Sequence, residues 1–106
     1  STTRECASKL TSIREYQQLM KDTYFDRDSR RGVSNTLLWL TCELGELADA
    51  CLRNDRETMK GEAADILAWL CSICNLLEID LEEASSRKYG KGCPNCGDSP
   101  CQCREP

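Results

Sequence analysis

The chain has 106 residues, of which 40% are apolar, and its formal net charge is −4. This length allows one domain with one hydrophobic core, and the acidic balance argues against binding a nucleic-acid polymer through a basic face. No apolar run approaches the ~18 residues of a membrane span, and residues 1–10 lack an apolar signal core, so we expect no membrane association and a cytoplasmic location.

Apolar residues recur with helical spacing along most of the chain, and no segment has the alternation of a strand. We expect three main helices, over residues 3–24, 35–53 and 57–77, with a polar loop at residues 25–33. Their apolar stripes form the expected core. The stripes comprise Leu10, Ile13, Tyr16, Leu19 and Met20 in the first helix, Leu37, Leu40, Leu44, Leu47 and Cys51 in the second, and Ala63, Ile66, Leu70, Ile73, Cys74 and Leu77 in the third.

A short fourth helix follows the three main ones. Asp80 and Glu83 have the spacing of a capping box, which predicts a helix from there to about Tyr89, ended by Gly90 and Gly92. The prediction is therefore an all-α helical bundle. Because so few helices have wide apolar faces to cover, we expect oligomerisation to complete the bundle. We divide the chain into a helical domain, residues 1–90, and a cysteine-rich tail, residues 91–106.

Nine cysteines are many for this length, but the odd count and the missing signal sequence weigh against a secreted disulfide scaffold. Five of them fall in helical sequence, where we expect small core side chains. These five are Cys6, Cys42, Cys51, Cys71 and Cys74. The chain has no histidine, which excludes histidine-based catalysis and any metal site that needs imidazole.

The other four cysteines crowd into the tail. The CPNCG segment that begins at Cys93 resembles a zinc knuckle, and a CQC segment begins at Cys101. The four thiolates of Cys93, Cys96, Cys101 and Cys103 suit tetrahedral, structural Zn²⁺. Because the Cys-x-Cys half is atypical of such sites, a disulfide pair in oxidised protein and a disordered reduced tail stand as alternatives.

Two acid pairs, Glu43-x-x-Glu46 and Glu62-x-x-Asp65, lie on consecutive expected helices. A spacing of three places the members of each pair about 60° apart, so both carboxylates point the same way. If the helices pack antiparallel, the four acids meet, and each ionised pair about 5 Å apart costs roughly 3 kcal/mol at an effective dielectric near ~20. Such a cluster needs a cation, and hard oxygen ligands suit Mg²⁺, which indicates phosphate chemistry.

Two tryptophans flank the acid pairs in mirrored positions. Trp39 lies one turn before Glu43, and Trp69 lies one turn after Asp65. Antiparallel packing then predicts an acidic cup with aromatic walls at the edge of the core. The ordinary alternatives are that each acid pair is a solvated helix face and that each tryptophan is a core or interface residue.

Residues 42–50, CELGELADA, and 62–70, EAADILAWL, resemble the MazG-like all-α nucleoside triphosphate pyrophosphohydrolases. The lead-in RRGV at residues 30–33 and the segment NLLEIDLEEA at residues 75–84 are also similar to that family. The resemblance covers about residues 24–89. One position departs from it: the family often has a second acid just before the first pair, where this chain has Cys42.

The resemblance implies hydrolysis of a nucleoside triphosphate between the α and β phosphates, which yields the monophosphate and pyrophosphate. It implies that Glu43, Glu46, Glu62 and Asp65 are the catalytic set and hold one or more Mg²⁺, which activates a water for attack on the α-phosphorus. One of these carboxylates is expected to act as the general base. The family usually forms dimers or tetramers, so we expect a homodimer or homotetramer whose site includes residues of a second subunit.

Further residues are candidates for holding the substrate. Basic side chains must meet the remaining phosphate charge, and the tryptophans offer faces on which a base can stack. Asn75, a polar residue in an apolar stretch, either touches substrate or caps a buried carbonyl, and each basic residue has a solvated surface as its alternative. The candidates are Trp39, Trp69, Asn75, Arg87, Lys88, Arg30 and Arg31.

Two other functions compete with this interpretation. Relatives of the fold hydrolyse a phosphoribosyl nucleotide in histidine synthesis, and a panel of substrates separates the two reactions. The non-enzymatic alternative is a zinc-tailed helical adaptor that docks a basic partner on its acidic face, without Mg²⁺-dependent turnover.

Overall fold

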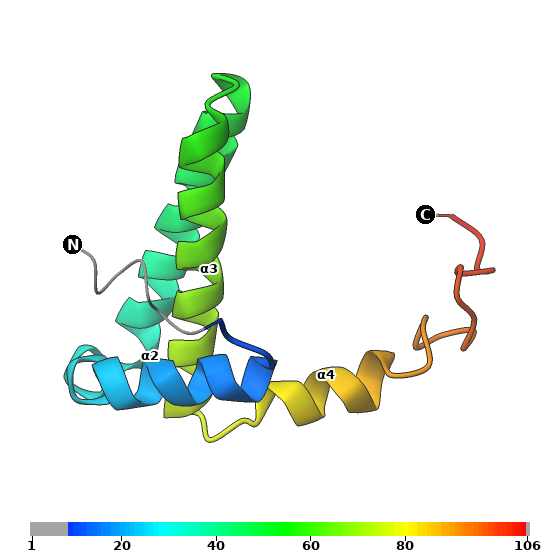
Figure 1. The fold of residues 1–106 in the computed structure, drawn as a ribbon, viewed down its shortest axis with the longest axis horizontal. Coiled ribbons are helices and arrows are strands. Elements are labelled where there is room, and N and C mark those ends of the chain that lie inside the picture. The colour runs from blue at the N-terminus through cyan, green and yellow to red at the C-terminus, as the bar shows by residue number, and fades with distance from the viewer. Residues whose placement is uncertain (1–8, 106) are drawn as a thin grey trace.

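The computed structural model describes residues 9–105 of the chain, which form three helices: α2 (Ile13–Leu52), α3 (Arg56–Leu76) and α4 (Leu81–Tyr89). No strand occurs within that range, so the all-α prediction is confirmed. Figure 1 shows that the second half of α2 and α3 lie side by side as a hairpin, that the first half of α2 crosses the base of this hairpin, and that α4 leads away from it.

A glycine separates the two halves of α2. The backbone leaves helical geometry at Gly32, where φ is 82° and ψ is 165°, and the Oγ of Thr36 donates to the Gly32 carbonyl at 2.7 Å. The expected loop over residues 25–33 is therefore wrong, because the helix continues to Arg31 and only one residue breaks it. The charged residues of this segment instead lie on a helix, where Asp28 and Arg31 form an ion pair of 2.7 Å.

The start of α2 also differs from the prediction. Residues 3–8 of the expected first helix lie outside the described range, and residues 9–12 are not helical. Ser12 caps the helix, since its Oγ accepts a hydrogen bond of 3.0 Å from the amide of Glu15. This cap sets the start of the helix at a point where apolar periodicity alone would continue it back to Leu10.

The starts of α3 and α4 follow the sequence signals closely. Asp55 caps α3 by accepting from the Thr58 amide at 3.2 Å. The N-cap predicted at Asp80 is confirmed, since its carboxylate accepts from the Glu83 amide at 3.1 Å. Gly90 is the C-cap of α4, and the remaining described residues form neither helix nor strand.

The first half of α2 fixes the position of α4. Arg14 forms ion pairs with Asp80 at 3.0 Å and with Glu82 at 2.8 Å. Both pairs are largely exposed, and exposed ion pairs contribute about 0–1 kcal/mol. The buried Gln17 adds a hydrogen bond of 3.0 Å from the Leu81 amide to its side-chain oxygen. These contacts hold the connection between α3 and α4 against the base of the hairpin.

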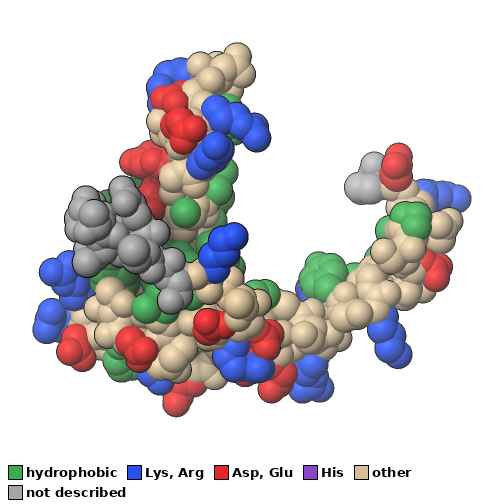
Figure 2. Space-filling view, in the orientation of Figure 1, with side chains coloured by type: hydrophobic (Ala, Val, Ile, Leu, Met, Phe, Trp, Pro, Cys, Tyr) green, Lys and Arg blue, Asp and Glu red, His purple; other side chains and the backbone are tan. Residues whose placement is uncertain are grey.

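Much of the expected core is exposed in the single chain. The buried apolar residues are Met20, Ala50, Cys71, Ile73 and Cys74. Leu37 and Leu44 of the expected α2 stripe are each 51% exposed, and Figure 2 shows apolar side chains along the open flank of the hairpin. The stripe prediction is wrong for these leucines within one chain, because no further described helix covers that face.

The helical cysteines divide in the same way. Cys71 and Cys74 are buried as expected, whereas Cys42 and Cys51 are exposed on α2, which corrects the core prediction for those two. Cys6 lies outside the described residues. None of the helices between residues 9 and 105 is both long and apolar enough to cross a membrane.

Candidate active site

Three carboxylates meet where the second half of α2 packs against α3. Glu43 and Glu46 come from α2 and Glu62 from α3, and one oxygen of each lies within 4.8 Å of the others. We call these residues the acid trio. Asp65, one turn further along α3 and one methylene shorter, is outside the trio but lines the adjoining cavity together with Glu43. The structure thus brings three of the four predicted acids into one group and places the fourth beside it.

The acid trio is electrostatically frustrated. The Oε2 atoms of Glu43 and Glu62 are buried and have no hydrogen-bond partner among the described residues. The pKa of Glu62 rises to about 7, because its protonated form hydrogen-bonds to Glu43, burial removes water, and the charges of Glu43 and Glu46 oppose its ionisation. Burial and the charge of Glu43 also raise the pKa of Asp65. Oxygen donors that are crowded, acidic and lack partners fit a hard divalent cation.

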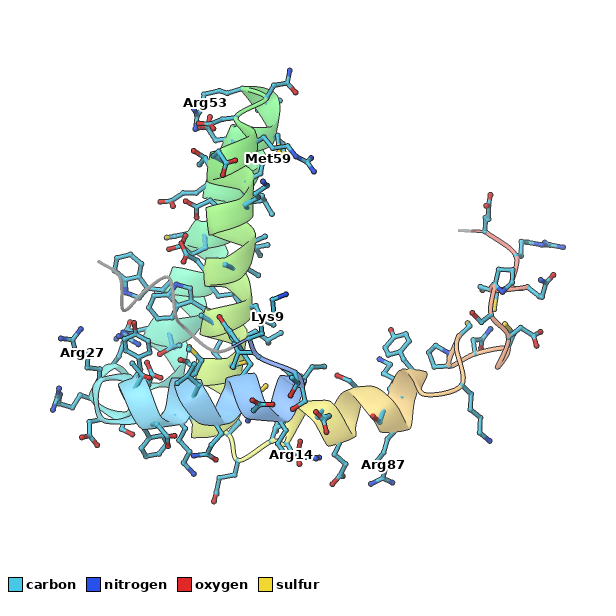
Figure 3. All side chains as sticks on the ribbon, viewed as in Figure 1. Lys9, Arg14, Arg27, Arg53, Met59 and Arg87 are labelled. Atoms are coloured by element: carbon cyan, nitrogen blue, oxygen red, sulfur yellow. The ribbon has the colours of Figure 1, made fainter. Side chains whose placement is uncertain are left out.

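A cavity of about 340 Å³ opens beside the trio. It lies between the first half of α2, the second half of α2 and α3, on the side of the molecule where Figure 3 labels Arg27. Its lining combines acids, arginines and aromatic rings, as a site for an anionic aromatic ligand requires. The lining residues are Tyr24, Arg27, Asp28, Arg31, Glu43, Asp65, Ala68, Trp69 and Ser72.

Arg31 is held in this cavity from two sides. One guanidinium nitrogen donates to Asp28 Oδ1 at 2.7 Å, and the guanidinium carbon lies 4.8 Å from the centre of the Trp69 ring. Asp28 is 1% exposed, and its Oδ2 has no partner within the described part of the chain. Sequence reasoning misses Asp28 because it assigns the segment to a loop; the i, i+3 spacing of Asp28 and Arg31 on a helix is the signal that identifies the pair.

The two tryptophans stack on each other. The ring centres of Trp39 and Trp69 are 6.0 Å apart and the planes differ by 7°, within the range of an aromatic pair. Trp39 is half exposed, so part of its ring remains open to a ligand or a partner.

The other predicted substrate residues lie elsewhere in the single chain. Asn75 is buried and its amide donates to the Gln17 carbonyl at 3.2 Å, so it caps a buried carbonyl, one of its two expected roles. Arg30 is exposed and does not line the cavity. Arg87 and Lys88 lie on α4, where Arg87 pairs with Glu83 at 3.7 Å, and Figure 3 shows Arg87 on the side of the molecule away from Arg27.

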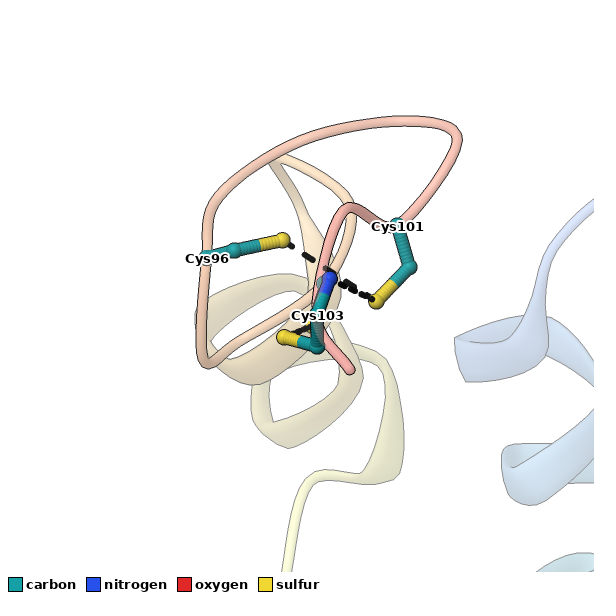
Figure 4. Close-up of side chains that lie close together, drawn as sticks. Cys96, Cys101 and Cys103 are labelled. Carbon is teal, nitrogen blue, oxygen red and sulfur yellow. Dashed lines mark hydrogen bonds between the residues drawn. The ribbon is translucent and has the colours of Figure 1, made fainter. Parts of the chain in front are cut away.

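The tail forms a second cluster of metal-ligating side chains. One sulfur from each of Cys93, Cys96, Cys101 and Cys103 lies within 4.8 Å of the others, and Figure 4 shows three of these side chains converging. Hydrogen bonds from the backbone amides of Gln102 and Asp98 lower the pKa of Cys96 to about 6.

Comparison with known families identifies residues 31–97 as a MazG nucleotide pyrophosphohydrolase domain. The matched stretch is more than half of the chain and contains the acid trio, Asp65, Arg31 and both tryptophans. No curated protein matches the chain.

Proposed function

Since the chain belongs to the MazG nucleotide pyrophosphohydrolase family, we propose that it hydrolyses nucleoside triphosphates to the monophosphate and pyrophosphate in a Mg²⁺-dependent reaction. The observation that carries the proposal is the acid trio, in which two buried oxygens have no hydrogen-bond partner within residues 9–105, at the edge of a cavity that also presents Arg31 and Trp69. A solvated helix face has no reason to bury carboxylate oxygens against one another.

Glu43, Glu46 and Glu62 are the residues that would hold Mg²⁺, with Asp65 as the adjoining carboxylate. Oxygen-only ligands, net negative charge and two buried oxygens without a partner in the described part of the chain match the preferences of this ion. When bound, Mg²⁺ supplies charge neutralisation for the phosphates and lowers the pKa of a bound water.

The remaining cavity residues bind and orient the nucleotide in this proposal. Arg31 uses one nitrogen for Asp28, which leaves guanidinium donors for phosphate oxygens, and charge-assisted bonds of this type are among the strongest in proteins. The stacked pair of Trp69, in the cavity lining, and Trp39, which is half exposed beside it, offers aromatic surface for a base. The proposal assigns no preference for a particular base or sugar.

A substrate panel tests the reaction. Purified protein is incubated with ribo- and deoxyribonucleoside triphosphates, with and without Mg²⁺, and the products are resolved. We expect monophosphate and pyrophosphate from at least one member, only with the metal. Diphosphate and free phosphate would contradict cleavage at the α-phosphorus. Turnover of a phosphoribosyl nucleotide alone would identify the second enzymatic function, and no turnover together with no Mg²⁺ binding would favour the adaptor.

Variants connect the activity to the site. Glu43→Gln, Glu46→Gln, Glu62→Gln and Asp65→Asn should each reduce kcat/KM by about a hundredfold or more, since each removes a charge that the bound cation needs. Glu57→Gln is the matched control, because Glu57 is an exposed acid in the first turn of α3 outside the cluster. Full activity in all four site variants would disprove the proposal.

The proposed active form is a homodimer or homotetramer. The Cα radius of gyration is 16.3 Å, whereas a compact domain of this length has about 13 Å. Exposed leucines along α2 supply the apolar surface that an interface buries. In an assembly, Arg87 and Lys88 of one subunit could reach the cavity of another. The mass of the protein in solution tests the proposed oligomer.

A cytoplasmic location completes the proposal. Nine cysteines in an odd number are unusual for a secreted disulfide scaffold and are better suited to a reducing compartment. Fractionation of the native host would test this placement.

A further inference from the structure

The tail has no apolar core of its own. Among residues 90–105, the side chains with intermediate burial belong to Cys93, Cys96 and Cys103, and the rest are exposed apart from Gly92. Figure 1 shows this segment beyond the far end of α4, away from the helical hairpin. A segment this short cannot hold one conformation by hydrophobic burial, so it needs a cross-link or a metal.

The four sulfur atoms are spaced for a tetrahedral metal. Sγ of Cys93 and Cys103 are 3.7 Å apart, and Sγ of Cys96 and Cys101 are 4.0 Å apart. Ligands at about 2.3 Å from a tetrahedral Zn²⁺ are separated by about 3.8 Å. All four are free thiols, and the whole set fits within 4.8 Å.

The surrounding backbone and an amide side chain supply donors to the sulfurs. The amides of Gln102 and Cys103 donate to Cys96 and Cys101 at 3.4 and 3.3 Å, and Asn95 Nδ2 donates to Cys103 at 3.1 Å. Four thiolates around one Zn²⁺ leave an excess negative charge, which such donors stabilise. A set of reduced, neutral thiols would gain little from them.

The turn that closes this cluster requires a glycine. Gly92 has a φ of 113°, and a Cβ there would lie 2.7 Å from the Asp98 carbonyl oxygen. The amide of Cys93 donates to that same carbonyl at 3.1 Å. This hydrogen bond joins the start of the tail to its middle, next to the cysteine cluster. The backbone of the tail therefore has a defined turn that brings the four sulfurs together.

We propose that Cys93, Cys96, Cys101 and Cys103 bind one structural Zn²⁺ that folds the tail. Four protein ligands leave no open coordination position, so the ion has no role in the hydrolysis. The chain thus has two metal sites of opposite chemistry: soft sulfur donors in the tail select Zn²⁺, and the hard oxygens of the acid trio suit Mg²⁺.

The zinc content of purified full-length protein tests the proposal. We expect one Zn²⁺ per chain by elemental analysis and native mass spectrometry under reducing conditions. Cys96→Ser combined with Cys101→Ser should lose the zinc and make the tail sensitive to protease. The matched control is Cys42→Ser combined with Cys51→Ser, which replaces two exposed thiols of α2 and should retain one Zn²⁺.

Replacement of the metal gives a second readout. Co²⁺ added to metal-free, reduced protein should produce the visible absorption of tetrahedral thiolate ligation, and the tail variant should not. Zinc retained by the tail variant would overturn the proposal, as would reduced wild-type protein without zinc or an intact mass that shows tail disulfides. Mg²⁺-dependent turnover is measured on the same variants. Zinc binding and hydrolysis are then scored independently, so failure of one proposal is distinguished from failure of the other.

Discussion

The carboxyl of Glu62 has a pKa of about 7, against an ordinary value of 4.5. Between these two values the folded protein holds a proton that the unfolded chain has released, so the metal-free fold loses stability as the pH rises through that window. Asp65, whose pKa is also raised, acts in the same direction. Thermal unfolding in the presence of a chelator should therefore show a falling Tm between about pH 4.5 and 7.

The Glu62→Gln variant is the control for this titration. Its amide cannot ionise, so most of the fall in Tm should disappear, while the stabilisation that Mg²⁺ gives to the wild type should also be lost. An identical pH dependence in the variant would show that other groups cause it.

Asp28 is a positioning residue in the proposed site, since it holds Arg31 without itself being accessible. Asp28→Ala should free the guanidinium and raise KM by about tenfold or more, because hydrogen bonds to charged groups contribute about 1.5–3 kcal/mol. Steady-state kinetics on the preferred triphosphate measure the effect. Asp26→Ala, an exposed acid on the same helix, is the control and should leave KM unchanged. A loss confined to kcat would contradict this role.

Gly32 determines how the first half of α2 meets the hairpin. Its φ of 82° and ψ of 165° lie in a region that is almost restricted to glycine. A Cβ at this position would meet no atom within 4 Å, so Gly32→Ala should cost only the backbone strain, about 1–3 kcal/mol. Denaturant unfolding measures this cost.

Gly61→Ala provides the opposite expectation. Gly61 lies inside α3 with open space around its Cβ position, so alanine should stabilise the protein by about 0.4–1 kcal/mol. Equal changes in the free energy of unfolding for the two substitutions would show that a non-glycine residue adopts the backbone conformation of position 32 without strain.

At the scale of the helices, structure is predictable where the ends have local signals. Asp80 and Glu83 mark the start of α4 in the sequence itself, and the structure forms that cap. The segment before Gly32 resists prediction because its dense charge is typical of a loop, although one glycine is its only breaker. The same difficulty conceals Asp28, whose role depends on a helix turn that brings it next to Arg31.

On the scale of the whole molecule, the exposed apolar stripe of α2 is the surface through which we propose that copies of the chain assemble. Leu44→Lys places a charge in that stripe and should convert an oligomer into monomers, because the ammonium group would have to be buried without a partner. Size-exclusion chromatography with light scattering gives the mass. Leu52→Lys is the control, since Leu52 is 85% exposed at the end of α2. An unchanged mass for Leu44→Lys would place the interface elsewhere.

The acid trio is partly predictable from spacing: helix geometry brings Glu43 and Glu46 to one face of α2, and the packing of α3 against α2 adds Glu62. What covers the exposed leucines of α2 is not predictable from the sequence. Periodicity shows that a helix face is apolar, but not whether the same chain or another one covers it. The stacking of Trp39 on Trp69 is intermediate: the mirrored spacing places both rings at one edge, and the packing of the helices decides that they meet.

The pair of tryptophans has an optical consequence. The chain has two tryptophans in all; Trp69 lines the proposed nucleotide cavity, and Trp39 stacks on it with ring centres 6.0 Å apart. Indole rings stacked this closely couple their electronic transitions, so the protein should show a split circular-dichroism band in the far ultraviolet. All of the protein's indole fluorescence arises from this pair. A nucleotide that binds against these rings should therefore change the tryptophan fluorescence, so binding can be measured without an added label.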